Sequence, residues 1–145
     1  MARKAAREAA MCLIYQRSVG GEGNISDYCD QMEDVVLNDE DHAYLSDVLR
    51  GVSEHSERID AQIENCSINW KLSRMPRVDA AVLRVAVYEL LYRDDIPERV
   101  SANEAVGLAK TYSGEQSAKF INGVLGKLIR DNATRKGPDQ EGIAE

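Results

Sequence analysis

Residues 76–93, PRVDAAVLRVAVYELLYR, decide the fold class of this chain. Apolar side chains cover most of the circumference of a helix drawn through this segment, and Arg84 and Glu89 interrupt them. A helix that is apolar nearly all round lies in the middle of a protein. Pro76 suits its first turn, because the backbone N–H that proline lacks has no partner there. We therefore predict a central buried helix, in which Glu89 pairs with Arg93 one turn later.

Helical patterns continue upstream of this segment. Apolar residues recur there at helical spacing, and asparagine, serine and acidic residues stand where helices begin. These patterns predict four helices: residues 2–19, from Asn24 or Ser26 to about Val36, from the acidic run 38–41 through Val52, and a shorter one over about 59–66.

Two more helices are expected downstream. Ser101 and Glu104 match the S-x-x-E capping box, which predicts the start of a sixth helix that ends near residue 112. A seventh begins at residues 113–114 and continues to about residue 132. Seven helices joined by short loops predict an all-α fold in one compact domain over residues 1–132. The polar residues 133–145 are expected to form a disordered tail.

The net charge of −7 is unevenly distributed along the chain. Residues 1–20 carry four basic side chains against one acid, whereas residues 21–69 carry thirteen acids against two bases. Residues 70–145 are nearly balanced, with twelve bases and eleven acids. A chain divided in this way can present a basic end to nucleic acid while its acidic region faces away and limits unspecific binding.

The sequence offers little for catalysis. Its two histidines lack an HxxxH spacing, and it contains neither a GxxxxGK[ST] loop nor a GxGxxG fingerprint. The acidic run at 39–42 is better explained as a capped helix start than as a metal site. Cys12, Cys29 and Cys66 form no CxxC pair and are interpreted as small apolar side chains. We expect no enzymatic activity, no cofactor and no bound metal.

The location of the protein also follows from its composition. No apolar block is long enough for a signal peptide or a membrane span. An odd number of widely separated cysteines is typical of a reducing compartment. We therefore expect a cytoplasmic protein without a membrane partner.

The first helix is one candidate surface for nucleic acid. Arg3 and Arg7 lie one turn apart and repel each other unless an anion relieves them, and Lys4 lies beside them. A phosphate would serve as that anion, although an exposed basic helix end without a partner explains the same pattern. Tyr15 either stacks on an unpaired base or packs in the core.

The start of the seventh helix is a second candidate surface. Backbone N–H groups around Gly114 and Gln116 can accept a phosphate, and Lys119 lies close by. Glu115 would repel an RNA backbone, and Phe120 alone is more typical of a core residue than of a stacking platform. The helix start is therefore compatible with RNA, and its residues alone do not establish binding.

A set of motifs occurs in a fixed order along most of the chain. It consists of ARE at 6–8 with Leu13 and Tyr15, WKLSR at 70–74, VDAAVLRVAVYEL at 78–90, DIP at 95–97, NEAV at 103–106, LAK at 108–110 and KFINGVL at 119–125. Together these motifs resemble the NusB family of bacterial transcription antitermination factors.

The resemblance implies a fold, partners and site residues. It implies two packed helical bundles and a protein that pairs with the ribosomal small-subunit protein NusE in an antitermination complex with RNA polymerase. The pair binds single-stranded boxA RNA, notably in ribosomal RNA leaders. By the same resemblance the RNA-contacting positions are Arg3, Lys4, Arg7, Tyr15, Gln116, Lys119 and Phe120, and those at the protein-partner surface are Tyr15 and Asp79.

One alternative belongs to a different functional class. The chain could be a protein-only interaction module, for example a homodimer that buries the RNA-binding surface and uses the acidic middle helices for contact. That alternative predicts no preference for any RNA. Titration with boxA-like and scrambled RNA separates the two hypotheses.

Overall fold

The computed structural model describes residues 4–32, 34–67 and 70–132. It contains α1 (Lys4–Ser18), α2 (Ile25–Gln31), α3 (Asp39–Glu54), α4 (Ser56–Cys66), the 3₁₀ turn η1 (Leu72–Arg74), α5 (Arg77–Tyr92), α6 (Glu98–Tyr112) and α7 (Glu115–Asp131). No strand occurs within these residues, so the predicted all-α fold is confirmed. The predicted tail over 133–145 and Arg3 lie outside the described residues.

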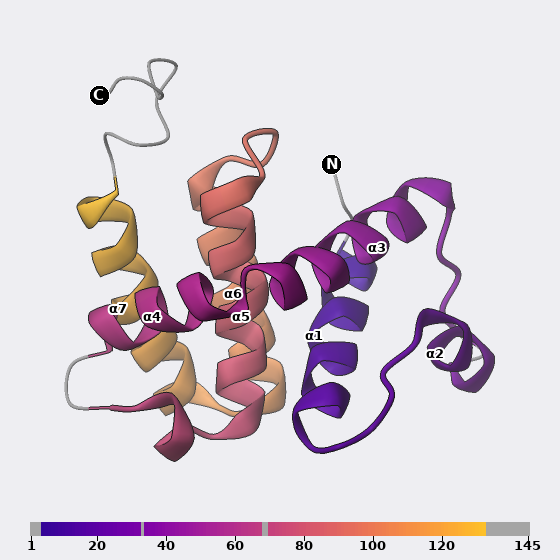
Figure 1. Ribbon diagram of the computed structural model, residues 1–145, viewed down its shortest axis with the longest axis horizontal. Coiled ribbons are helices and arrows are strands. Elements are labelled where there is room, and N and C mark those ends of the chain that lie inside the picture. The colour runs from indigo at the N-terminus through magenta and orange to yellow at the C-terminus, as the bar shows by residue number, and fades with distance from the viewer. Residues whose placement is uncertain (1–3, 33, 68–69, 133–145) are drawn as a thin grey trace.

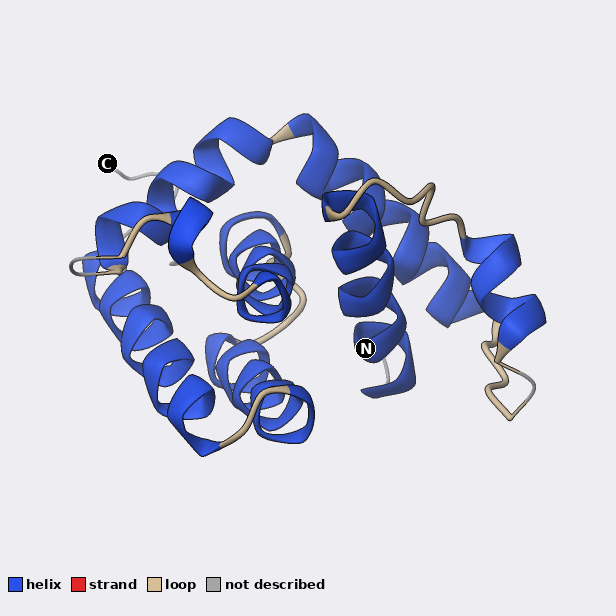
Figure 2. Cartoon of the chain, turned by 90° about the horizontal axis from the view of Figure 1, so that it is seen from below, coloured by secondary structure: helices blue, strands red, loops and turns tan. Residues whose placement is uncertain are grey.

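The helices form two packed groups (Figure 1). Helices α1 to α3 make up the amino-terminal bundle, and α4 to α7 make up the carboxy-terminal bundle. Seen from below, the two groups lie side by side (Figure 2). Helices α3 and α4 follow each other across both groups and are separated at His55. Helix α5 contacts α1, α3, α4, α6 and α7, so its predicted central position is confirmed.

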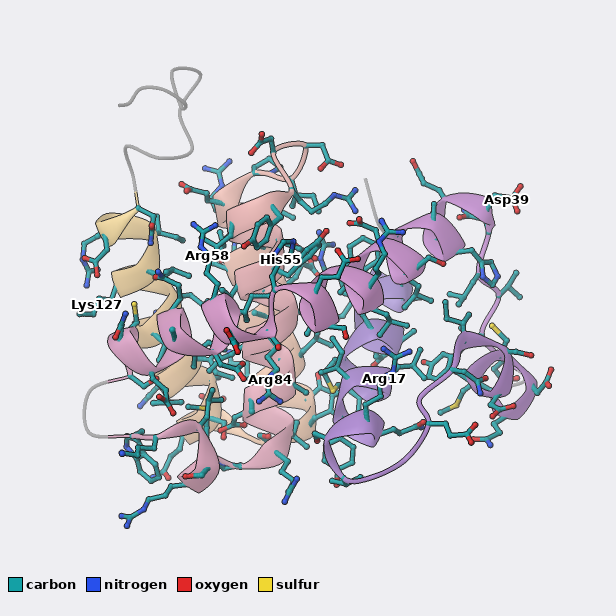
Figure 3. All side chains as sticks on the ribbon, viewed as in Figure 1. Arg17, Asp39, His55, Arg58, Arg84 and Lys127 are labelled. Atoms are coloured by element: carbon teal, nitrogen blue, oxygen red, sulfur yellow. The ribbon has the colours of Figure 1, made fainter. Side chains whose placement is uncertain are left out.

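The central helix is buried because its apolar side chains face both bundles. Val82, Leu83 and Val87 have no exposed surface. Burying a side chain of this size contributes about 1.5–3 kcal/mol. Arg84 reaches out of the same helix toward α4, where its Nε lies 3.0 Å from the Asp60 carboxylate (Figure 3). The charge that interrupts the apolar pattern is therefore neutralised at the edge of the core.

Glu89 is the charged residue at the centre of the fold. Its carboxylate accepts hydrogen bonds from Arg7 Nε at 2.9 Å, from the Ser101 hydroxyl at 2.7 Å and from the Tyr44 hydroxyl. Burial and the nearby Glu89 charge raise the pKa of Tyr44 well above its usual value, so the phenol remains protonated and can donate. These contacts join α1 and α3 to α5 and α6, and we call the four side chains the Glu89 network.

Two predictions about this region are wrong. Glu89 does not pair with Arg93, whose guanidinium instead lies 3.1 Å from Asp47 and 2.8 Å from Asp95. Ser101 does not cap α6, because the helix begins at Glu98 and the hydroxyl of Ser101 serves the Glu89 network. In both cases a partner distant in sequence replaces the local one.

The predicted starts of α2 and α3 are confirmed, whereas the predicted start of the first helix at residue 2 lies outside the described residues. Asn24 caps α2 by accepting from the N–H of Asp27 at 2.8 Å. Asn38 and Asp41 form a reciprocal capping box at the start of α3, so this acidic run is explained as a helix start. Helix α2 ends at Gln31, five residues before the predicted end near Val36, which is 78% exposed.

Candidate nucleic-acid interface

The basic residues predicted on the first helix do not share one surface. Lys4 is exposed at the start of α1. Arg7 is only 4% exposed, and its guanidinium is bound to Glu89 inside the protein. This placement does not support the predicted RNA contact of Arg7, because this turn of α1 faces α5, whose Glu89 supplies a carboxylate where a phosphate was expected. Arg3 lies outside the described residues.

Three helix ends meet at one end of the molecule. The guanidinium of Arg77 at the start of α5 donates to the carbonyl oxygen of Ser18 at the end of α1, at 2.7 Å. The hydroxyl of Ser117 at the start of α7 donates to Asp79 of α5, at 2.9 Å. Tyr15 is half-buried in the last turn of α1, where its carbonyl oxygen accepts the hydroxyl of Ser18 at 2.7 Å. Lys4 is eleven residues away along α1, about 16 Å at the helical rise.

Asp79 has a different place from the one predicted. It is only 3% exposed, so its burial does not support the predicted place at a protein-partner surface. One of its oxygens holds Ser117, and within the described residues the other, Oδ1, is buried without a hydrogen-bond partner. A carboxylate beside the start of α7 complements the helix dipole. Asp79 therefore fixes α7 against α5.

The start of α7 is less suited to phosphate than its sequence indicates. Gly114, with φ of +109°, turns the chain directly from α6 into α7. Gln116 is exposed in the first turn. The carboxylates of Asp79 and Glu115 both lie at this end of the helix and oppose a second anion at its N–H groups. The basic side chains of α7 lie further along the helix, at Lys119, Lys127 and Arg130.

Lys119 and Phe120 lie one turn further along α7. Lys119 is exposed, whereas Phe120 is half-buried and packs against the core. The ring of Phe120 meets that of Trp70 edge to face, with centroids 6.2 Å apart and an angle of 62° between the planes. Beside these rings lies a hollow of about 340 Å³, which Lys119, Lys127 and Arg130 also line.

Sequence reasoning missed Trp70, Lys127 and Arg130. The two cations follow Lys119 at intervals that place all three on one side of α7, and this spacing was the available signal. Trp70 gave no such signal, since it stands in a connector and meets Phe120 only through the fold.

The charges around the hollow are mainly positive. Lys127 lies 3.0 Å from Asp131, and this hydrogen bond raises the pKa of the Lys127 ammonium group (Figure 3). Lys119 and Arg130 have no acidic partner among the described residues. Unpaired cations beside exposed rings can bind anionic groups that carry a planar ring.

The described residues provide little for other kinds of chemistry. Among them, no group of His, Cys, Asp and Glu is arranged to hold a metal ion. Within the same residues no helix is long and apolar enough to cross a membrane. The three cysteines are free thiols, and burial raises the pKa of Cys12 and Cys66, which disfavours the reactive thiolate.

The fold and the candidate site together define a class of protein: an all-α protein of two packed bundles with a cationic, aromatic surface along α7. The model of the NusB family matches residues 4–130. The transcription antitermination protein NusB of Acetivibrio thermocellus is 49% identical over 130 residues, which cover 90% of each chain. The chain therefore belongs to the NusB family, as its motifs predicted.

Solved structures agree with this assignment. The NusB structure of T. maritima has a TM-score of 0.80 and 30% identity, covering 94% of this chain and 98% of the other. A complex of the antitermination factors NusB and NusE with double-stranded RNA contains a chain with a TM-score of 0.76 and 27% identity. That match covers 89% of this chain and 96% of the other.

Proposed function

We propose that this protein is a transcription antitermination factor that binds boxA-type single-stranded RNA together with NusE and supports ribosomal RNA transcription. The observation that carries the proposal is the similarity, over nearly the whole chain, to a protein solved in complex with both NusE and double-stranded RNA. The protein acts by binding and carries out no catalytic step. Its site of action is the antitermination complex of RNA polymerase.

The RNA-binding residues of the proposal are a reduced set. Lys119 and Gln116 are exposed on the first turns of α7, with Phe120 beside them, and Lys4 is exposed at the start of α1. Tyr15 lies half-buried in the last turn of α1 and packs against the core, and in the proposal it borders both the RNA and the NusE surface. Asp79 contributes indirectly by holding Ser117 in place.

The charge distribution supports an RNA face on the carboxy-terminal bundle. Helix α2 and the start of α3 carry exposed acids and lie at the far side of the molecule from α7 (Figure 1). Negative charge at that side repels RNA, while the cations of α7 attract it. RNA is thereby directed to one end of the protein.

A binding titration tests the proposal. Labelled boxA-like RNA and a scrambled RNA of equal length and composition are titrated with the protein, with and without NusE. We expect preference for the boxA-like sequence, tighter binding with NusE, and a logarithmic salt slope of about −0.7 for each phosphate contacted. Equal binding of the two RNAs in every condition would refute the proposal.

The protein-only alternative has its own signature in the same experiment. A homodimer that buries the α7 surface would sediment as a dimer and bind neither RNA. In that case NusE would fail to restore RNA binding. A monomer that binds boxA-like RNA with NusE would exclude this alternative.

A further inference from the structure

Trp70 exposes a large apolar ring to water, which the hydrophobic effect disfavours. It is the only tryptophan of the chain, and 48% of its surface is open to water. Large aromatic side chains are mostly buried on average, so a half-exposed indole forgoes much of its possible hydrophobic stabilisation. Core packing therefore does not explain the position of this ring.

Phe120 holds the exposed ring from one side. It packs against the hydrophobic core and meets Trp70 edge to face at 6.2 Å, a favourable arrangement for two aromatic rings. The backbone N–H of Trp70 donates to the carbonyl of Ser67 at 3.1 Å. The indole is thus kept at the surface by a ring partner and by a backbone hydrogen bond.

Two hollows meet at Trp70. The hollow of about 340 Å³ extends along α7, and a second one of about 670 Å³ extends toward η1. Trp70 and Ser67 line both. A planar group of nucleobase size can therefore approach the indole without displacing the core.

Cations lie on both sides of the indole. Lys119, Lys127 and Arg130 line the hollow along α7. Lys71 and Arg74 line the other, and Glu64 there accepts the N–H of Leu72 at 3.0 Å, which holds η1 in place. A chain that carries a planar base between successive phosphates matches this order of cation, ring and cation.

We propose that Trp70 is the platform on which one unpaired RNA base stacks, with Phe120 as its positioning residue and the cations of η1 and α7 holding the flanking phosphates. This inference rests on the proposed function and assigns the stacking role to Trp70 instead of Phe120. It selects single-stranded RNA, because the bases of a duplex are stacked on one another and present no free face.

The intrinsic fluorescence of the only tryptophan provides a direct test. The full chain is titrated with a single-stranded boxA-like RNA, with its duplex, and with a polyglutamate peptide, while the anisotropy of end-labelled RNA reports binding independently. We expect quenching of Trp70 by the single strand alone. Unchanged fluorescence at saturating single strand, or equal quenching by duplex or peptide, would overturn the inference and leave the proposed function standing.

Two variants of Trp70 distinguish the contribution of aromatic stacking from that of apolar side-chain volume. Trp70→Leu keeps an apolar side chain without an aromatic face, and Trp70→Phe keeps a smaller face. We expect Trp70→Leu to weaken binding between about fivefold and about 150-fold, and Trp70→Phe to restore most of the affinity. Equal affinity of Trp70→Leu and the wild type would overturn the platform role. Absence of RNA binding by the wild type would refute the proposed function as well.

Discussion

The Glu89 network and the surface around Trp70 are both built from cations and aromatic rings, but they differ in exposure to water. In the network, Arg7 is 4% exposed and Glu89 is 1% exposed. The guanidinium of Arg7 also lies 5.8 Å from the centre of the Tyr44 ring. In the network, the buried charges of Arg7 and Glu89 therefore neutralise each other inside the protein, and their contacts connect the two bundles.

The surface around Trp70 has the opposite character. Its ring is about half exposed, and Lys119 and Arg130 have no acidic partner among the described residues. The comparison shows that a cation beside an aromatic ring takes its role from the carboxylates that the fold brings to it. In the network a buried carboxylate holds the cation within the fold, whereas at the surface around Trp70 two exposed cations have no such partner within the part of the chain that the structure describes, and this is where we propose that RNA binds.

The largest effect is expected from breaking the Glu89 network. Glu89→Gln keeps the shape of the side chain but removes the negative charge that faces the buried Arg7. Breaking a buried ion pair lowers the free energy of unfolding by about 3–5 kcal/mol. Urea denaturation measures this change.

The control for this substitution is Glu104→Gln on α6, where the carboxylate is partly exposed. We expect the control to change the free energy of unfolding by no more than about 0.5 kcal/mol. Equal stability of the two variants would contradict the assigned role of Glu89.

Two helix glycines sharpen the contrast between interior and surface. A Cβ at Gly51 of α3 would lie 2.1 Å from the Tyr88 ring, whereas a Cβ at Gly107 of α6 would meet nothing within 4 Å. Overpacking should make Gly51→Ala less stable by about 1–3 kcal/mol. Gly107→Ala should raise stability by up to about 1 kcal/mol, because alanine favours the helix. Thermal unfolding of both variants measures these changes in stability. A stabilising effect of Gly51→Ala would show that the Tyr88 ring moves aside at little cost and would contradict the prediction.

The cations of the exposed surface should affect binding more than stability. Lys119→Ala removes one phosphate contact of the proposed site, so we expect the logarithmic salt slope for single-stranded RNA to become less negative by about 0.7. Its free energy of unfolding should change by less than about 0.5 kcal/mol. Arg99→Ala, an exposed cation in the first turn of α6, is the matched control and should leave the slope unchanged. A slope altered equally by both variants would indicate only general charge attraction.

The smallest effect is expected from an exposed ion pair. Hydrogen bonds from Arg93 at 2.8 and 2.9 Å lower the pKa of Asp95 to about 2. A pKa lower in the folded state means that the pair stabilises the protein above about pH 4 and loses this contribution as the pH falls toward 2. Asp95 is 57% exposed, so Asp95→Asn should cost less than about 1 kcal/mol at pH 7. Urea denaturation from pH 7 to pH 2 should show this difference shrinking, and a constant difference would rule out the pair as its source.

The sequence predicted those features that depend on neighbouring residues. The apolar surface of α5 and the caps at Asn24 and Asn38 follow from helical periodicity and from hydrogen bonds over three residues, which the chain order contains directly. The motifs that resemble the NusB family lie in order along the chain, and they identified the family before the fold was known.

Local reasoning was wrong where a distant partner replaced a near one. Ser101 matches a capping box, but its hydroxyl binds Glu89 twelve residues away. Arg7 looks like a free cation of a basic helix, but its carboxylate partner is 82 residues away. In each case a buried polar group takes the partner that the packed core supplies, because leaving a buried charge unpaired is costly.

By itself, the sequence determined the all-α class, the central helix and the family, because each follows from the order and spacing of residues along the chain. The tertiary structure alone decided that Arg7 is buried against Glu89, that Asp79 is buried and holds Ser117, and that Trp70 meets Phe120 at the surface. These outcomes depend on which segments pack together, and burial and distance between such segments arise only when the bundles assemble.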